Sequence, residues 1–239
     1  MKVCSQTSWA CPEEGQIMDS CSHEACVRKV PIFSDLDNEK ISKLNSLVKN
    51  KEYKSGELIY LEGEIGKNIY IIESGLVKLY RSNEEGNQYI LRLLKEGDFF
   101  GELVLFKEEQ LSSSAEAVGD CSICLLPKNE LEKLIKLSSE LSYKLLSAIT
   151  SRLTKTENKL QSLALEDAKE KTMRLLLELA KENGIKKENG ILINLPLSRD
   201  GLANLIGTTQ ETLSRKLSAL QKEGIISMQG QKKILIKND

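Results

Sequence analysis

The stretch Leu197–Leu217, LSRDGLANLIGTTQETLSRKL, decides how the C-terminal part of the chain folds. It predicts two short helices joined by a tight turn. Ser198 is a residue type that caps helix N-termini, and Gly207 can adopt the left-handed backbone conformation that ends a helix. Apolar residues recur at helical spacing, namely Leu202, Leu205 and Ile206 in the first helix and Leu213, Leu217 and Leu220 in the second. This pattern is typical of a helix-turn-helix.

The second helix is predicted to begin near Thr208, where Thr208-Thr209-Gln210-Glu211 matches a capping box, and to end at Gly224. Four polar side chains then point outward from its first turns, namely Gln210, Glu211, Ser214 and Arg215. In a helix-turn-helix these positions enter the major groove, where Arg binds O6 and N7 of guanine and Glu accepts from N4 of cytosine. The alternative is an ordinary antiparallel helix pair with solvated charges.

Two short β-rich runs follow these helices. Ile225–Met228 and Lys233–Ile236 are joined around Gly230, which predicts the β-hairpin wing of a winged helix. The segment from Pro196 to Asp239 holds seven Lys or Arg and four Asp or Glu, a surplus of three positive charges, whereas the whole chain has a net charge of −1. The distribution of charge, and not its total, therefore favours nucleic-acid binding by this segment.

The spacing Glu211-x-x-Ser214-Arg215 resembles the recognition helix of the CRP/FNR transcription regulators. The family is named for the cyclic-AMP receptor protein and the fumarate and nitrate reductase regulator. The serine at position 214 resembles the FNR branch, because the cyclic-AMP receptor protein has glycine at this position. The resemblance implies that Glu211, Ser214 and Arg215 read a TTGAT-type half-site in palindromic double-stranded DNA. It also implies RNA polymerase as a partner.

The middle of the chain is dense in glycine. Of the fifteen glycines in the whole chain, eight lie here, at positions 56, 63, 66, 75, 86, 97, 101 and 119. They separate β-rich runs such as Glu57–Leu61, Ile69–Ile72 and Leu76–Tyr80, a spacing that predicts an antiparallel barrel or sandwich. Gly75-Leu76-Val77 and Gly101-Glu102-Leu103 resemble segments of the cyclic-nucleotide-binding barrel family. The predicted fold class is therefore α+β, with an N-terminal antiparallel β-barrel, a long helix and a C-terminal winged helix-turn-helix.

A cyclic-nucleotide ligand does not follow from the predicted barrel. Nucleotide-binding members of that family have an Arg-Ser pair shortly after Gly-Glu-Leu, but the matching stretch Leu111–Ala115 has no Arg. A buried phosphate without a cationic partner is strongly penalised. We therefore expect no cyclic nucleotide and interpret Glu102 as a solvated or backbone-capping carboxylate in a turn. A cyclic-nucleotide-binding regulator is retained as an alternative.

Long helices are predicted between Lys128 and Asn183, where no Gly or Pro occurs. Leucines repeat every seven residues at positions 146, 153 and 160, with Ile149, Thr156 and Leu163 interleaved, so the segment from about Glu140 to Gln161 can supercoil against a partner. The predicted dimer seam is Leu146, Ile149, Leu153 and Leu160. Alternatively, this stripe packs on the barrel. A lone helix-turn-helix has little area for DNA binding, which favours a homodimer with recognition helices about 34 Å apart.

These features divide the chain into a Cys-rich arm (1–30), a sensory β-barrel (31–130), a dimerisation helix (131–163) and a winged helix-turn-helix domain (164–239). The last domain is predicted to open with a helix over about Leu165–Glu182, followed by a turn and a short strand before Pro196. A length of 239 residues with 40% apolar content lets each folded domain bury a core. No apolar run has the length of a signal peptide or a membrane span, so we expect a cytosolic protein.

The six cysteines lie in two groups. Cys4, Cys11, Cys21 and Cys26 are in the N-terminal arm, and Cys121 and Cys124 are in a late strand of the barrel. Because structural disulfides are rare in reducing cytosol, clustered thiols suggest metal ligation or redox sensing. Thiolates suit iron–sulfur clusters and zinc. The cysteines therefore predict a sensory role for the arm and the barrel together.

FNR-type oxygen sensors hold a [4Fe-4S] cluster with three N-terminal cysteines and one from the barrel, and two segments here resemble that arrangement. Cys124-Leu-Leu-Pro127 resembles the context of the barrel ligand, and Cys26 precedes Val30–Phe33 much as the last N-terminal ligand precedes an Ile-Pro-Phe. The resemblance assigns the cluster ligands to Cys11, Cys21, Cys26 and Cys124, with Cys4 as the substitute. The N-terminal gaps of six, nine and four residues differ from the family's compact gaps of two and five.

Three other interpretations of the cysteines stay open. A thiol–disulfide switch would join an N-terminal cysteine to a barrel cysteine without a metal. Zinc would use Cys21-x-His23-x-x-Cys26, and the third interpretation gives the cysteines only a packing role. Haem is disfavoured because His23 is the only histidine in the chain.

No motif points to an enzyme. A single histidine excludes a His-pair metal site, and the chain has neither a Gly-x-x-x-x-Gly-Lys phosphate loop nor a Gly-x-Ser-x-Gly elbow. A nucleotide-binding module without DNA activity is disfavoured by Glu211-x-x-Ser214-Arg215 and the wing. The sequence therefore predicts a DNA-binding regulator and no catalytic activity.

Overall fold

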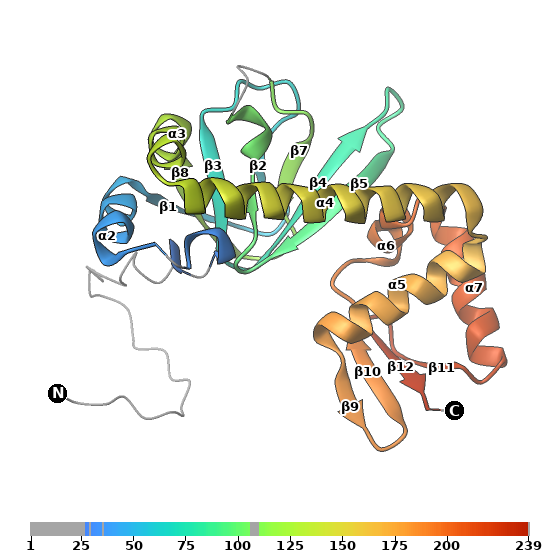
Figure 1. Ribbon diagram of the computed structural model, residues 1–239. Coiled ribbons are helices and arrows are strands. Elements are labelled where there is room, and N and C mark those ends of the chain that lie inside the picture. Colours follow the sequence, from blue (N-terminus) through green and yellow to red (C-terminus); the bar gives the residue numbers. More distant parts are fainter. Residues whose placement is uncertain (1–26, 29, 35, 106–109, 239) are drawn as a thin grey trace, which may run out of the picture.

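The computed structural model describes residues 27–28, 30–34, 36–105 and 110–238 (Figure 1). Its N-terminal domain contains eight strands: β1 (Lys49–Tyr53), β2 (Leu58–Tyr60), β3 (Asn68–Ser74), β4 (Leu76–Ser82), β5 (Gln88–Lys95), β6 (Phe99–Phe100), β7 (Ser114–Ala117) and β8 (Cys121–Pro127). They form two antiparallel four-stranded sheets, with the orders β1-β8-β3-β6 and β2-β7-β4-β5. The α+β class is confirmed. The two sheets remain separate rather than closing into one barrel, because no ladder joins their edges within the described residues.

The strands follow the apolar patterning of the sequence. In β3, Ile69, Ile71 and Ile72 are fully buried, and β8 adds Ile123 and Leu126 to the same core. The N-terminal helices cover this core: η1 (Pro31–Phe33) and α2 (Asn38–Leu47), which Asp37 caps by accepting from the Lys40 backbone N–H at 2.8 Å. A short turn of helix, η2 (Glu102–Val104), follows β6.

Two helices follow β8 where the sequence predicted one helix over 131–163. They are α3 (Lys128–Leu137) and α4 (Ser139–Leu165). Ser138 separates them in an extended conformation, and its hydroxyl accepts a hydrogen bond from the Leu141 backbone N–H at 3.3 Å. A serine N-cap thus begins a new helix at a point that the absence of Gly and Pro did not reveal. Figure 1 shows α4 running along the N-terminal domain toward the C-terminal one.

The C-terminal domain combines three helices with a four-stranded sheet. Its elements are α5 (Ala168–Asn183), β9 (Ile185–Lys187), β10 (Gly190–Asn194), α6 (Arg199–Leu205), α7 (Gln210–Lys222), β11 (Ile226–Gln229) and β12 (Lys233–Lys237). The sheet order is β11-β12-β10-β9. Helix α5 begins three residues later than predicted because Asp167 and Glu170 form a capping box. The strand predicted before Pro196 is a two-stranded hairpin, β9–β10.

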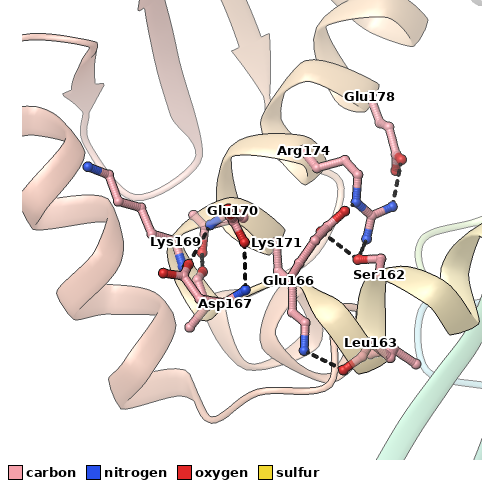
Figure 2. A network of polar contacts seen from close by, with 11 residues as sticks. Ser162, Leu163, Glu166, Asp167, Lys169, Glu170, Lys171, Arg174 and Glu178 are labelled. Atoms are coloured by element: carbon pink, nitrogen blue, oxygen red, sulfur yellow. Dashed lines mark hydrogen bonds and ion pairs between the residues drawn. The ribbon is translucent and has the colours of Figure 1, made fainter.

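A polar network fixes the bend between α4 and α5 (Figure 2). Arg174 donates from Nε to Glu166 Oε2 at 2.9 Å and from Nη1 to Glu178 Oε1 at 3.0 Å, and it also hydrogen-bonds the Ser162 hydroxyl. The hydrogen bond from Ser162, and then Arg174, lower the pKa of Glu166. These contacts set the direction in which α5 leaves α4.

The β4–β5 hairpin of the N-terminal domain contributes to the core of the C-terminal domain. Tyr80 and Ile90 are buried in one apolar cluster with Leu176, Leu202 and Leu217. The two domains are therefore joined by a common apolar core as well as by the chain between them.

Lys159 of α4 adds a polar contact to this junction. Its Nζ donates to the carbonyl oxygens of Ile90 at 2.9 Å and Leu91 at 3.1 Å, and lies 4.9 Å from the centroid of the Tyr89 ring. Burial, followed by the charge of Arg174, lowers the pKa of Lys159 to about 8. Helix α4 is thus held against the hairpin by an ammonium group bound to backbone oxygens.

Candidate nucleic-acid interface

Helices α6 and α7 form the predicted helix-turn-helix. Ser198 caps α6 as predicted, because its Oγ accepts a hydrogen bond from the Gly201 backbone N–H at 3.1 Å. Gly207 ends the first helix with a φ of +65°, again as predicted. A Cβ at this position would lie 2.9 Å from Leu163 Cδ2, so the turn also packs against the end of α4. The glycine is needed both for its conformation and for this close approach.

The cap of α7 differs from the sequence prediction. The N-cap is Thr209 and not Thr208, and its Oγ1 accepts a hydrogen bond from the Thr212 backbone N–H at 3.2 Å. The predicted capping box with Glu211 is therefore wrong. Because Thr209 forms the cap, Glu211 lies in the first turn with its side chain exposed.

One face of α7 is buried and the opposite face is open. Leu213, Leu217 and Leu220 are at most 2% exposed, whereas the four predicted DNA-reading residues, Gln210, Glu211, Ser214 and Arg215, are all exposed. The open face carries a shallow groove of about 410 Å³, lined by Glu211, Ser214, Arg215, Ser218, Ala219 and Lys222. The structure therefore brings three of the four predicted residues together in one concavity and adds three that the sequence did not single out.

The guanidinium of Arg215 is held at the first turn of α7. Its Nη2 donates to Thr212 Oγ1 at 3.3 Å, and Thr212 is itself hydrogen-bonded to the cap residue Thr209 at 3.0 Å. In the part of the chain that the structure describes, Arg215 forms no ion pair. Its donors are therefore available to an external acceptor.

The wing is present as predicted. β11 and β12 pair antiparallel with Ile226 opposite Ile236, and Gly230 lies between them with a φ of +70°. Gln221 of α7 accepts a hydrogen bond from the Met228 backbone N–H at 3.1 Å. This contact fixes the wing relative to the open face of α7.

The two strand cysteines lie on β8, as predicted. Cys124 is fully buried opposite Asn50 of β1 and Ile71 of β3, and it is disulfide-bonded. Cys121 is a buried free thiol, and burial raises its pKa. The other candidate ligands, namely Cys4, Cys11, Cys21, Cys26 and the single histidine His23, lie outside the described residues. Among the described residues no group of three or more His, Cys, Asp or Glu is arranged to hold a metal ion.

The chain that leaves the cysteine-rich segment enters the same core as Cys124. Val27, which directly follows Cys26 in the sequence, is fully buried, as are Val30 and Phe33. All three belong to the apolar cluster that contains Cys124. Cys124 and the chain that directly follows Cys26 therefore lie in one apolar core.

Glu102 is not the solvated or backbone-capping carboxylate that the sequence predicted. It is 7% exposed rather than solvated, and its Oε1 lies 2.5 Å from Arg152 Nη1 of α4 and 3.5 Å from Arg92 Nη1 of β5. Arg152 also donates from Nη2 to the Phe99 carbonyl oxygen at 2.7 Å, with its guanidinium carbon 4.0 Å from the centroid of the Phe99 ring. Burial, and then the charge of Arg152, lower the pKa of Arg92. These arginines come from elements that are distant in the sequence, and no local pattern indicates that they meet Glu102.

The predicted dimer seam lies mostly on the exposed side of α4. Leu146, Leu153 and Leu160 are 63%, 57% and 67% exposed, and Tyr143 extends this row of apolar side chains. Ile149 instead packs against the core of the N-terminal domain. The three leucines repeat every seven residues on this exposed side, which is the spacing of a helix surface that a second helix covers.

Two family models match the chain. One is the cyclic nucleotide-binding domain, over residues 50–138, and the other is the Crp-like helix-turn-helix domain, over residues 170–238. The first covers most of the two sheets, and the second covers α5 to β12.

Known relatives match most of the chain. The cyclic AMP receptor protein of Thermus thermophilus is 30% identical over 83% of this chain and 88% of its own length, and the anaerobic regulatory protein of Bacillus subtilis is 29% identical over 86% and 87%. The structure of FixK2 from Bradyrhizobium japonicum matches with a TM-score of 0.71 and 28% identity, over 80% of this chain and 93% of that one.

These relatives are regulators and not enzymes, in agreement with the motifs. No helix in the described ranges is long and apolar enough to cross a membrane. Regulators of this kind bind DNA and act as dimers, which matches the open face of α7 and the exposed leucines of α4. The chain belongs to the CRP/FNR family and is a DNA-binding transcription regulator.

Proposed function

We propose that this regulator binds TTGAT-like palindromes as a homodimer and senses oxygen or redox state through a [4Fe-4S] cluster. The proposed ligands are Cys11, Cys21, Cys26 and Cys124. The observation that carries the sensory part is the burial of Val27, next to Cys26, in the core that contains Cys124. RNA polymerase is proposed as a further partner, by family membership.

The site preference is supported by the open face of α7. Glu211 and Arg215 are one helical turn apart and line the same groove, with Ser214 between them. An exposed Glu can accept from cytosine N4 and an exposed Arg can bind guanine bidentately, which are the contacts that the guanine of TTGAT and its paired cytosine offer. The spacing Glu-x-x-Ser-Arg is that of the FNR branch.

Arg215→Ala tests this assignment. We expect the variant to lose about 1 to 3 kcal/mol of binding free energy on a TTGAT palindrome and to relax the preference for guanine, because one bidentate contact carries that discrimination. The fold should be retained because Arg215 is exposed, and circular dichroism checks this. Binding is measured on the palindrome and on duplexes with each base substituted at the guanine. An unchanged order of preference would show that Arg215 does not read that base.

The sensory proposal rests on coupling between the arm and the domain that holds α4. A bound cluster would supply a redox centre that oxygen can oxidise. The chain's part is to hold the arm against the sandwich through Cys124 on β8, and to transmit that attachment to α4. Helix α4 contacts η1, next to the buried arm residues Val27 and Val30, and it also contacts α3, which in turn contacts β8. Ligation can therefore bias how α4 packs by its own free energy.

We expect anaerobically purified protein to be brown and air to bleach it, with a change in DNA affinity that follows the colour. Cys124→Ser should abolish both the colour and the response, because it removes the ligand on β8. Cys121→Ser is the matched control, since Cys121 lies on the same strand and is not a proposed ligand. The visible spectrum and a gel shift under nitrogen and under air measure both effects. Colourless anaerobic wild-type protein would contradict the cluster.

A thiol–disulfide switch is the second candidate, and the disulfide-bonded state of Cys124 favours it. In that case the protein is colourless, and diamide changes its DNA affinity in a way that dithiothreitol reverses. Redox-independent DNA binding by colourless protein would exclude both sensors. We expect no cyclic nucleotide, because Leu111–Ala115 has no Arg and the buried Ser114 already accepts the Glu62 backbone N–H at 3.0 Å.

A further inference from the structure

We propose that Lys222 and Ser218 form a phosphate-binding end of the α7 groove, which contacts the DNA backbone while Glu211 and Arg215 contact bases. This inference rests on the proposed DNA-binding role of α7. It assigns to the C-terminal half of the groove a ligand, the phosphodiester group, and a function, which is to position the helix without reading sequence.

The spacing of the lining residues places the two ends at different depths in the DNA. Glu211, Arg215, Ser218 and Lys222 follow one another at intervals of four, three and four residues, so they share one face of α7. Lys222 lies eleven positions after Glu211, an axial distance of about 16 Å along the helix. The major groove is about 12 Å wide. When the first turns of α7 lie at the base edges, the last turn therefore lies near the phosphates at the rim.

The charge of Lys222 is not neutralised within the described protein. The neighbouring carboxylate, Glu223, is already bound on both oxygens by Lys169 of α5, at 2.7 Å each. Lys222 itself is exposed and forms no ion pair in the described ranges. Beside it, Ser218 offers a hydroxyl and Ala219 only a methyl group, which leaves the groove open for a bulky phosphate.

The residues on both sides of Lys222 are anchored to other elements. Gln221 accepts from the Met228 backbone N–H of the wing, and Glu223 binds Lys169 of α5. The backbone at Lys222 is thus fixed relative to the wing and to the rest of the domain. A lysine presented from a fixed backbone loses less freedom on binding a phosphate than one on a mobile segment.

Lys222→Gln in the full-length protein tests the inference. Each phosphate contact contributes about 0.9 to the slope of log affinity against log salt concentration, so a dimer that loses two contacts loses about 1.8. Between 50 and 200 mM salt, the affinity of the variant should therefore fall roughly tenfold less than that of the wild type. The ratio of affinities for a TTGAT palindrome and a scrambled duplex should stay unchanged, in contrast to Arg215→Ala.

Lys187→Gln is the matched control. Lys187 is an exposed lysine on β9, at the edge of the sheet opposite β11, and α7 is bound to β11. It should leave the salt slope at the wild-type value. Thermal unfolding separates the proposed role from a purely structural one, because a lysine in the last turn also stabilises its own helix. The unfolding temperature of Lys222→Gln should lie within a few degrees of that of the wild type.

A salt slope of Lys222→Gln equal to that of the wild type would overturn the inference, as would a changed palindrome-to-scrambled ratio. A different result would contradict the TTGAT proposal, namely equal binding of the palindrome and the scrambled duplex by the wild type. In that case the salt slope measured on the scrambled duplex would still decide whether Lys222 contacts phosphate.

Discussion

Leu153→Glu is expected to convert the regulator from a dimer into monomers. Leu153 lies in the middle of the exposed row that Leu146 and Leu160 continue on either side, so a partner helix would bury it on both protomers. Burying a carboxylate without a cation costs on the order of 4 kcal/mol, or roughly a thousandfold in the dimer dissociation constant. The affinity for a palindrome should fall in parallel, because both half-sites are then bound by separate molecules.

Multi-angle light scattering at micromolar concentration measures this effect. Ser151→Glu is the control, since Ser151 is exposed on α4 two residues before Leu153 and points to the other side of the helix. It should remain dimeric. If Leu153→Glu also stays dimeric, the subunits associate through a surface other than this row.

Glu102→Gln should destabilise the N-terminal domain by about 3 kcal/mol. The substitution keeps the size of the side chain but removes the negative charge that lies 2.5 Å from Arg152 Nη1 and 3.5 Å from Arg92 Nη1. Two cations would then face each other with no anion between them. Breaking a buried ion pair costs about 3 to 5 kcal/mol. The lower end applies because the Arg92 side chain keeps 31% of its exposure and is partly screened by solvent.

Urea unfolding followed by circular dichroism measures the loss. Glu62→Gln is the control, because the Glu62 and Arg81 side chains form an ion pair at 3.2 Å while 40% and 54% exposed. An exposed pair of this kind contributes at most about 1 kcal/mol. Equal stability of Glu102→Gln and Glu62→Gln would mean that the buried pair does not hold α4 to the sandwich.

The parts of the fold that depend on local sequence were predictable. Ser198 and Gly207 mark the ends of α6 by capping chemistry, and the apolar spacing of α7 identifies its buried face. The wing follows from two β-rich runs around Gly230. In each case the determining residues lie within a few positions of the element that they define.

Features that depend on distant residues were not predictable. Glu102, Arg92 and Arg152 belong to η2, β5 and α4, and no local pattern shows that they meet. The separate sheets depend on ladders that strand composition does not determine. Ile149 fits the heptad, yet the core of the N-terminal domain covers it. The break at Ser138 did have a local signal, a serine followed by Glu140 in the first turn of α4, but the long run without Gly or Pro concealed it.

The core shared by the β4–β5 hairpin and the C-terminal domain has a consequence for biosynthesis. Tyr80 and Ile90 are translated about a hundred residues before most of the side chains that they help to bury, and domains generally fold in the order of their synthesis. The hairpin is then in place as a template when α5, α6 and α7 leave the ribosome. The DNA-binding half would thus complete its folding on an N-terminal half that is already folded.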